Sequence, residues 1–278
     1  MPSPVEVREL AVARDGGSVA VRLFTSEEPR SLLVWAHGGG FSRGSLDMPE
    51  SHEVGLALAA AGHAVASVDY RLVGEGVAFP APHDDVSDVL AWALSTVEAP
   101  VFAGGASAGG NLAAGAALRL LREGQPPAGV VLAYPLLHAR VPGEPVTLPP
   151  DVPREARFPP EVLEPLVAAF APGERMHEPF AFVGDHPIDA FPPTLLVASE
   201  HDALRPSAEA FAASLAAAGV EVRLEVEPGT LHGHLDEAGQ PGFRATIGRI
   251  AAWLDERTPG VRGSSARGLS GEDQLKLE

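Results

Sequence analysis

From residue 31 onward, short apolar segments rich in Val and Leu alternate with longer segments of helical periodicity. The expected strands cover residues 31–36, 64–69, 100–103, 129–134, 194–199 and 221–227, and the expected helices cover residues 50–61, 83–97, 108–123, 205–218 and 242–257. Strands that are apolar throughout and separated by helices are typical of a parallel sheet with both faces covered. The pattern therefore predicts an α/β fold with a mostly parallel central sheet and helices on both faces.

Two segments depart from this alternation. Residues 5–24 alternate around Asp15-Gly16-Gly17, which predicts an opening β-hairpin. Residues 138–193 are crowded with proline, and only residues 161–170 show helical periodicity. We expect an insert over the sheet there, either a lid or binding loop or a surface excursion. One face of its helix would line a groove or pack onto the domain, and it consists of Phe158, Leu163, Leu166, Val167 and Phe170.

The length and composition indicate one soluble domain. A chain of 278 residues, 45% of them hydrophobic, can bury a sizeable core, so we expect a single domain over residues 1–257. Residues 258–278 are rich in Gly, Ser and charge, and we expect a disordered tail or a remnant of cloning there. Residues 1–17 lack the apolar run of a signal peptide, and no apolar segment is long enough to span a bilayer. We expect a cytoplasmic protein without a membrane partner.

Composition also excludes several kinds of site. The absence of cysteine removes disulfides, thiolate catalysis and cysteine-bound zinc. A formal charge of −17 makes nucleic acid a poor partner, because binding a polyanion depends on basic side chains. The glycine runs match neither a Walker loop nor a dinucleotide fingerprint, so no cofactor is expected. His83-Asp84-Asp85 opens a helix, where adjacent carboxylates suit the helix dipole better than one metal ion, so no metal is expected.

The sharpest local motif is Gly104-Gly105-Ala106-Ser107-Ala108-Gly109-Gly110, which lies between an expected strand and an expected helix. A G-x-S-x-G sequence at such a turn holds its serine in a strained conformation at the carboxyl end of the sheet. Small residues at Gly105 and Gly109 allow the strand and the helix to approach closely. Ser107 is therefore the predicted nucleophile.

A glycine-rich loop, His37-Gly38-Gly39-Gly40-Phe41, follows the strand over residues 31–36 and reaches the same edge of the sheet. Acyl transfer through a tetrahedral intermediate needs N–H donors aimed at the developing oxyanion. The residue after the nucleophile, Ala108, supplies one such N–H, and we expect Gly39 and Gly40 to supply the others. The side chain of His37 is expected to hold the loop in place.

A serine nucleophile also needs a base and an acid, and in this fold they follow it along the chain in the order acid, then histidine. Asp202 comes just after the strand over residues 194–199, and His232 comes after the strand over residues 221–227. Both loops lie at the carboxyl end of the sheet. We expect Asp202 and His232 to complete a catalytic triad with Ser107, with Glu200 as the alternative acid and His234 as the alternative base.

Together these elements resemble the hormone-sensitive lipase family of bacterial carboxylesterases, which is marked by an HGGG loop, a GDSAGG-like turn, a D-x-L acid loop and a late HG. The similarity covers about residues 31–254 and includes Asp69-Tyr70-Arg71-Leu72. The chain departs from the family at Ala106, at Arg205-Pro206-Ser207 and at His234. Family members also carry helices before the first strand, so the resemblance implies a reduced cap built mainly from residues 138–193.

The resemblance implies an α/β-hydrolase fold and a serine carboxylesterase that cleaves a small-molecule ester of short to medium chain length through an acyl-enzyme. One alternative is an amide or formamide hydrolase, such as the kynurenine formamidase-like proteins, which also carry an HGG loop. Another is a silent binding protein such as the gibberellin receptors, which lose the histidine, and the presence of His232 argues against it. The sequence leaves a homodimer open.

Overall fold

The computed structural model describes residues 4–152 and 157–258. Its strands are β1 (Glu6–Arg14), β2 (Gly17–Thr25), β3 (Leu32–Ala36), β4 (Ala64–Asp69), β5 (Val101–Ala106), β6 (Gly129–Ala133), β7 (Thr194–His201) and β8 (Val222–Leu231). Its helices are α1 (Pro49–Ala60), α2 (Ala81–Thr96), α3 (Ala108–Arg122), α4 (Pro160–Phe170), α5 (Arg205–Ala217) and α6 (Pro241–Arg257), with short 3₁₀ helices η2 (Gly173–His177), η3 (Val183–Asp185) and η4 (His234–Asp236). The predicted alternation of strands and helices is confirmed.

The strands form one sheet in the order β1-β2-β4-β3-β5-β6-β7-β8. The six strands β4-β3-β5-β6-β7-β8 are all parallel to one another. Strand β2 runs antiparallel to both of its neighbours, β1 and β4. The predicted hairpin is β1 and β2, in which Arg14 pairs with Gly17 across a two-residue loop. Gly16 in that loop has a φ of 80°, a conformation that glycine adopts without steric cost.

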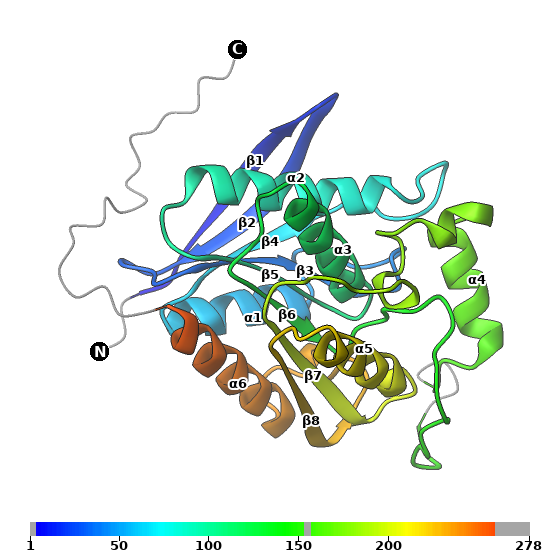
Figure 1. Ribbon diagram of the computed structural model, residues 1–278. Helices are drawn as coiled ribbons and strands as arrows, with labels where there is room; N and C mark the ends of the chain where they lie inside the picture. Colours follow the sequence, from blue (N-terminus) through cyan, green and yellow to red (C-terminus); the bar gives the residue numbers. More distant parts are fainter. Residues whose placement is uncertain (1–3, 153–156, 259–278) are drawn as a thin grey trace.

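Helices cover both faces of the sheet, as Figure 1 shows. Side chains alternate along each strand, so β3 sends Leu32 and Val34 to one face and Leu33 and Trp35 to the other. The first face packs against α2, α3 and α5, and the second packs against α1 and α6. Burial on both faces explains why the central strands are apolar throughout.

Three strands extend beyond their predicted ends. β5 continues through residues 104–106, β7 reaches His201, and β8 continues through Pro228 and Gly229 to Leu231. Glycine and proline have low strand propensity, so the sequence predicted earlier ends for β5 and β8, whose last residues include Gly104, Gly105, Pro228 and Gly229. In the structure residues 104–106 of β5 pair with β6, whereas β8 passes through an irregular stretch at residues 228–230 before Leu231 pairs with His201 of β7.

The insert over residues 138–193 contains α4, η2 and η3 and lies along one side of the sheet, at the right of Figure 1. The described part of the insert adds no strand to the sheet. Val167 and Phe170 are the buried residues of α4, and Phe170 stacks on Phe41 with ring centroids 3.8 Å apart. These two side chains pack the helix onto the domain, as one of the two alternatives predicted.

No helix in the described ranges combines the length and the apolar character needed to cross a bilayer. The predicted tail over residues 258–278 lies, apart from Thr258, outside the described residues.

Candidate active site

Ser107 occupies the turn between β5 and α3, with φ 52° and ψ −117°, a region that non-glycine residues rarely adopt. Its N–H donates to Ala133 O in β6 at 2.9 Å, which fixes the turn to the sheet. A side chain on Gly105 would overlap the backbone of Gly109, and a side chain on Gly109 would overlap Ala36 O. The predicted close approach of strand and helix is therefore present, and it maintains the strained conformation of Ser107.

Asp202 and His232 follow directly on two residues that pair across the sheet. The last pair of the β7–β8 ladder joins His201 to Leu231. The residue after each of them is therefore delivered to the same place, although the two lie 30 positions apart in the sequence. The extended ends of β7 and β8 are thus the reason that this carboxylate and this imidazole meet.

The three side chains form a continuous hydrogen-bonded series. Ser107 Oγ lies 2.9 Å from His232 Nε2, and His232 Nδ1 lies 2.8 Å from Asp202 Oδ2. Because an ionised carboxylate only accepts, Nδ1 carries the proton and Nε2 is free to accept one from the hydroxyl. The other carboxylate oxygen of Asp202 accepts the N–H of Leu204 at 2.8 Å, and the Asp202 side chain is completely buried. The residue that orients the imidazole is itself held firmly.

Charges around His232 favour its protonated form. Burial lowers the pKa of the imidazole, but the attraction of Asp202, helped by Glu50 and Asp236, outweighs burial and raises the pKa of His232 above its usual 6.5. A base with a raised pKa accepts a proton more readily when the hydroxyl attacks.

The glycine loop lies beside Ser107, since a Cβ on Gly38 would come within 3.2 Å of Ser107 Cβ. Gly39 and Gly40 have φ values of 104° and 61°, and the N–H of Arg43 donates to Gly39 O at 3.1 Å. Ala108 is the first residue of α3, so its N–H is one of the helix donors without a carbonyl partner one turn earlier. The loop and the helix start thus bring backbone donors to the edge where Ser107 lies.

His37 supports this loop through contacts made by its ring and its carbonyl. His37 Nδ1 lies 2.7 Å from Gly38 O, and the ring stacks on Tyr70 with centroids 4.4 Å apart. The hydroxyl of Tyr70 donates to His37 O at 2.9 Å. These contacts fit the predicted structural role of His37, and they place Tyr70 of the Asp69–Leu72 motif beneath the loop.

The alternative acid and base make other contacts. Glu200 Oε2 accepts the N–H of Gly229 at 2.7 Å, so it stabilises the irregular stretch of β8. His234 is buried between Ser199 Oγ and Thr246 Oγ1, at 2.9 and 2.8 Å. Burial, with the nearby His232, lowers the pKa of His234 to about 4. Neither side chain takes part in the series that ends at Ser107.

The side chains of His83, Asp84 and Asp85 contact different partners. Asp85 pairs with Arg71 at 2.8 Å, Asp84 pairs with Arg119 at 2.9 Å, and the buried ring of His83 stacks on Phe180. No group of three or more metal-ligating side chains is found in the part of the chain that the structure describes.

Two side chains of the insert reach the site. The ring of Phe158 meets the ring of His232 edge to face, with centroids 4.6 Å apart. Leu166 lies over Gly40, where an added Cβ would come within 2.6 Å of Leu166 Cδ1. The predicted apolar face is therefore divided: Val167 and Phe170 anchor the helix, whereas Phe158 and Leu166 form a wall over the site.

Two further residues at the site were not predicted from the sequence. Glu50 is buried behind the glycine loop, and its carboxylate accepts the N–H of Gly38. Tyr134 donates its hydroxyl to the same carboxylate at 2.6 Å. Tyr134 directly follows β6 at the carboxyl end of the sheet, a position that could have marked it as a site residue.

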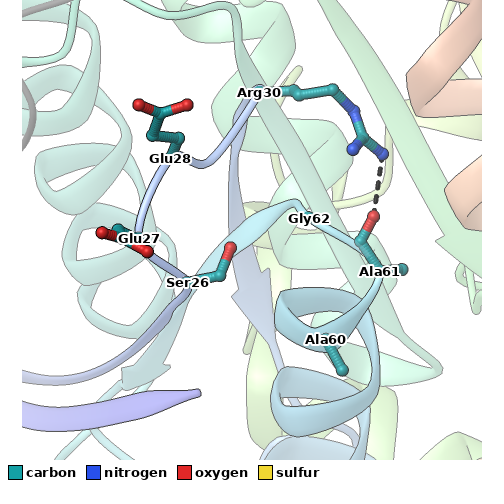
Figure 2. A pocket seen from close by; sticks show the side chains of 7 residues that line it. All are labelled: Ser26, Glu27, Glu28, Arg30, Ala60, Ala61 and Gly62. Atoms are coloured by element: carbon teal, nitrogen blue, oxygen red, sulfur yellow. Dashed lines mark hydrogen bonds between the residues drawn. The ribbon is translucent and has the colours of Figure 1, made fainter. Parts of the chain in front are cut away.

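Two cavities lie near opposite ends of the parallel strands. A cavity of about 400 Å³ lies where the chain enters β3 and β4, and Figure 2 shows Arg30 at its edge donating to Ala61 O. That is the amino end of the parallel strands, opposite Ser107. A second cavity, of about 290 Å³, is lined by residues between Pro228 and Phe243 and includes His232. Ligands in open α/β sheets bind at the carboxyl ends of the strands, where the second cavity adjoins His232, although Ser107 and the glycine loop do not line it.

Several known proteins that this chain resembles are named esterases. The alpha/beta hydrolase fold family matches residues 33–236. The carboxylesterase NlhH of Mycobacterium tuberculosis is 32% identical over 254 residues, which span 84% of this chain and 77% of the relative. The carboxylesterase EstE1 from a metagenomic library superposes with a TM-score of 0.81 at 25% identity, covering 94% of this chain and 92% of EstE1.

Brefeldin A esterase, described as a bacterial homologue of human hormone-sensitive lipase, superposes with a TM-score of 0.80 at 26% identity. The superposition covers 92% of this chain and 78% of that enzyme. The predicted resemblance to this group of esterases is confirmed, and the chain belongs to the alpha/beta hydrolase fold family.

Proposed function

We propose that the protein is a serine carboxylesterase in which Ser107 is the nucleophile, His232 the general base and Asp202 the acid that orients it. The observation that carries this proposal is the hydrogen-bonded series from Ser107 Oγ through both nitrogens of His232 to Asp202, with distances of 2.9 and 2.8 Å. The relatives are named carboxylesterases and esterases, which supports an ester as the substrate.

In the first half of the reaction, His232 Nε2 takes the hydroxyl proton as Ser107 Oγ bonds to the ester carbonyl carbon. The carbonyl oxygen becomes an oxyanion, which the N–H groups of Gly39, Gly40 and Ala108 stabilise. The imidazolium then gives its proton to the alcohol oxygen as the carbon–oxygen bond breaks. The alcohol leaves, and the acyl group remains on Ser107.

In the second half, water attacks the acyl carbon while His232 takes a proton from it. The second tetrahedral intermediate collapses, the serine oxygen recovers its proton from the imidazolium, and the carboxylic acid leaves. Asp202 keeps Nδ1 protonated and the ring aligned throughout, because its other oxygen is held by Leu204 N–H.

The substrate is an ester of short to medium acyl length, about two to eight carbons. Phe158 contacts the ring of His232, and Leu166 covers Gly40, so the insert closes over the reacting atoms. Each methylene contributes about 0.8 kcal/mol to binding only where apolar wall encloses it. Carbons beyond this wall therefore add little to transition-state binding.

The proposal is tested with nitrophenyl esters of graded acyl length and with a fluorophosphonate probe. We expect turnover of the short esters and covalent labelling at Ser107, both lost in Ser107→Ala. A folded protein that labels at another residue, or that turns over esters without Ser107, would contradict the proposal.

A matched pair of ester and amide substrates separates the esterase from an amide or formamide hydrolase. An esterase favours the ester, whereas a formamidase retains high efficiency on the N-formyl compound. Binding of the ester without turnover or labelling would instead indicate a silent binding protein on the same fold.

A further inference from the structure

Glu50 in the first turn of α1 carries a carboxyl group that the triad mechanism does not use, and the residue is only 2% exposed. One carboxylate oxygen accepts the N–H of Gly38, and the other accepts the hydroxyl of Tyr134 at 2.6 Å. The Glu50 carbonyl accepts the indole N–H of Trp35 at 2.9 Å. Both ends of the residue are therefore fixed to the core, on the side of the glycine loop away from solvent.

Gly38 lies in a narrow space between Glu50 and the nucleophile. A Cβ on Gly38 would overlap Glu50 Oε1 and would come within 3.2 Å of Ser107 Cβ. The peptide held by Glu50 thus lies next to Ser107 and continues along the chain into Gly39 and Gly40. A displacement of the carboxylate would move the proposed oxyanion donors relative to Ser107 Oγ.

Charged and titratable groups from several elements face Glu50. Asp236 of η4 accepts the Glu50 N–H at 3.2 Å, His232 follows β8, Tyr134 follows β6, and Tyr70 follows β4. Burial, together with the charge of Asp236, raises the pKa of Glu50 to about 7, although Tyr134, Gly38 and His232 act in the opposite direction. The fold therefore keeps a carboxylate where burial disfavours its charge, and such a group is a candidate for a functional role.

We propose that Glu50 is a positioning residue of the esterase, which holds the Gly38–Gly40 loop at Ser107 through its hydrogen bond to Gly38 N–H. The hydroxyl of Tyr134 fixes the carboxylate by its hydrogen bond to the second oxygen. This inference rests on the proposed function, because it assigns the loop to the oxyanion. A loop held in this way acts when the carbonyl oxygen becomes charged, so its loss lowers kcat and leaves KM nearly unchanged.

Three variants test the two hydrogen bonds of the Glu50 carboxylate separately. Glu50→Ala removes both acceptors, and we expect kcat to fall about 100-fold, the effect of misplacing a catalytic group by about 1 Å. Glu50→Gln keeps an acceptor for Gly38 N–H and should restore at least a tenth of wild-type kcat. Tyr134→Phe removes only the hydroxyl that donates to the second oxygen of Glu50. Its kcat should lie between the values for the two Glu50 variants. Glu53→Ala, on the same helix, is the matched control.

Three readouts distinguish positioning from a general loss of structure. The affinity of a trifluoromethyl ketone, which forms an oxyanion on the serine, should fall in parallel with kcat, whereas KM should change less than about threefold. Glu50→Gln removes a negative charge facing His232, so the acid limb of its pH profile should move to lower pH. Its melting temperature at pH 8 should rise, because a buried ionised carboxylate is replaced by a neutral amide of the same size.

Wild-type kcat in Glu50→Ala, or a loss as large in Glu50→Gln as in Glu50→Ala, would overturn the inference. An effect on KM alone would overturn it as well. Ser107→Ala is measured in parallel: if it is inactive while Glu50→Ala is fully active, only the Glu50 inference fails. Activity that survives Ser107→Ala would overturn the proposed function and the inference together.

Discussion

The turn at Ser107 and the insert over residues 138–193 meet at the same site but are built on different principles. Every residue over 101–118 is buried, and backbone groups there approach so closely that Gly105 and Gly109 have no room for a side chain. In α4, by contrast, Val167 and Phe170 are the buried residues, and the rest of the helix is exposed or half-buried. The chemistry is therefore supported by the backbone, whereas the substrate wall depends on a few side chains that can change independently.

The largest expected effect concerns the two histidines after β8. His232→Ala should lower kcat by about 10⁴-fold or more, because it removes the proton acceptor of Ser107. His234→Ala should lower kcat less than about tenfold, since His234 contacts Ser199 and Thr246 rather than the nucleophile. Steady-state kinetics on a short nitrophenyl ester checks both. Similar losses in the two variants would show that the chemistry does not depend on one histidine.

A glycine substitution in each region tests the difference in packing. Gly109→Ala should destabilise the protein by about 3 kcal/mol or more, because its Cβ would overlap the carbonyl oxygens of Ala36 and His37. Gly173→Ala in the insert should cost only about 1 kcal/mol, since its Cβ meets open space and only the φ of 62° is unfavourable. Urea unfolding gives both values. Equal costs would contradict the contrast between the two regions.

Shortening the insert's wall should change selectivity and leave the chemistry in place. Leu166→Ala opens the space over Gly40, so the optimum should move toward longer acyl chains, by about fourfold in kcat/KM for each methylene newly enclosed. The control is Glu164→Ala, on the exposed side of the same helix. This variant should keep the wild-type dependence of kcat/KM on acyl length. A uniform loss over all chain lengths would mean that Leu166 supports the site rather than limits the substrate.

The smallest expected effect is on pH dependence. The base must be neutral to accept a proton, and the pKa of His232 is raised above 6.5, so the acid limb of kcat/KM should have its midpoint above pH 6.5. Activity is then lost as the pH falls through this raised value. A midpoint below 6.5 would mean that burial outweighs the surrounding carboxylates. Varying the salt concentration as well shows whether the charge of Asp236 is screened.

Much of the fold could be predicted because the decisive signals were local. The Gly105–Gly109 spacing, the strand before Asp202 and the strand before His232 each depend on residues a few positions apart. The strand ends that the sequence did not predict depend on pairing with neighbouring strands. The strand ends at residues 104–106 and 228–231 contain Gly and Pro, which have low strand propensity, and they are fixed by pairing of residues 104–106 with β6 and of Leu231 with His201.

Glu50 shows why part of the site stayed hidden. A glutamate in the first turn of a helix is usually solvated and favourable for the helix dipole, so its sequence context predicts an exposed residue. Its partners, Gly38, Tyr134 and Asp236, come from three separate elements. Only their arrangement in space reveals that this carboxyl is enclosed.

The pairing of His201 with Leu231 also restricts how such a chain can vary in length. Successive residues of a strand point to opposite faces, so inserting one residue before Leu231 would direct the side chain of His232 away from Asp202. A compensating insertion in β7 would have to occur at the same level of the sheet. The helix between these strands, α5, lies outside this restriction. We therefore expect length changes among homologues to concentrate in the α5 connection and to be rare in the last residues of β7 and β8.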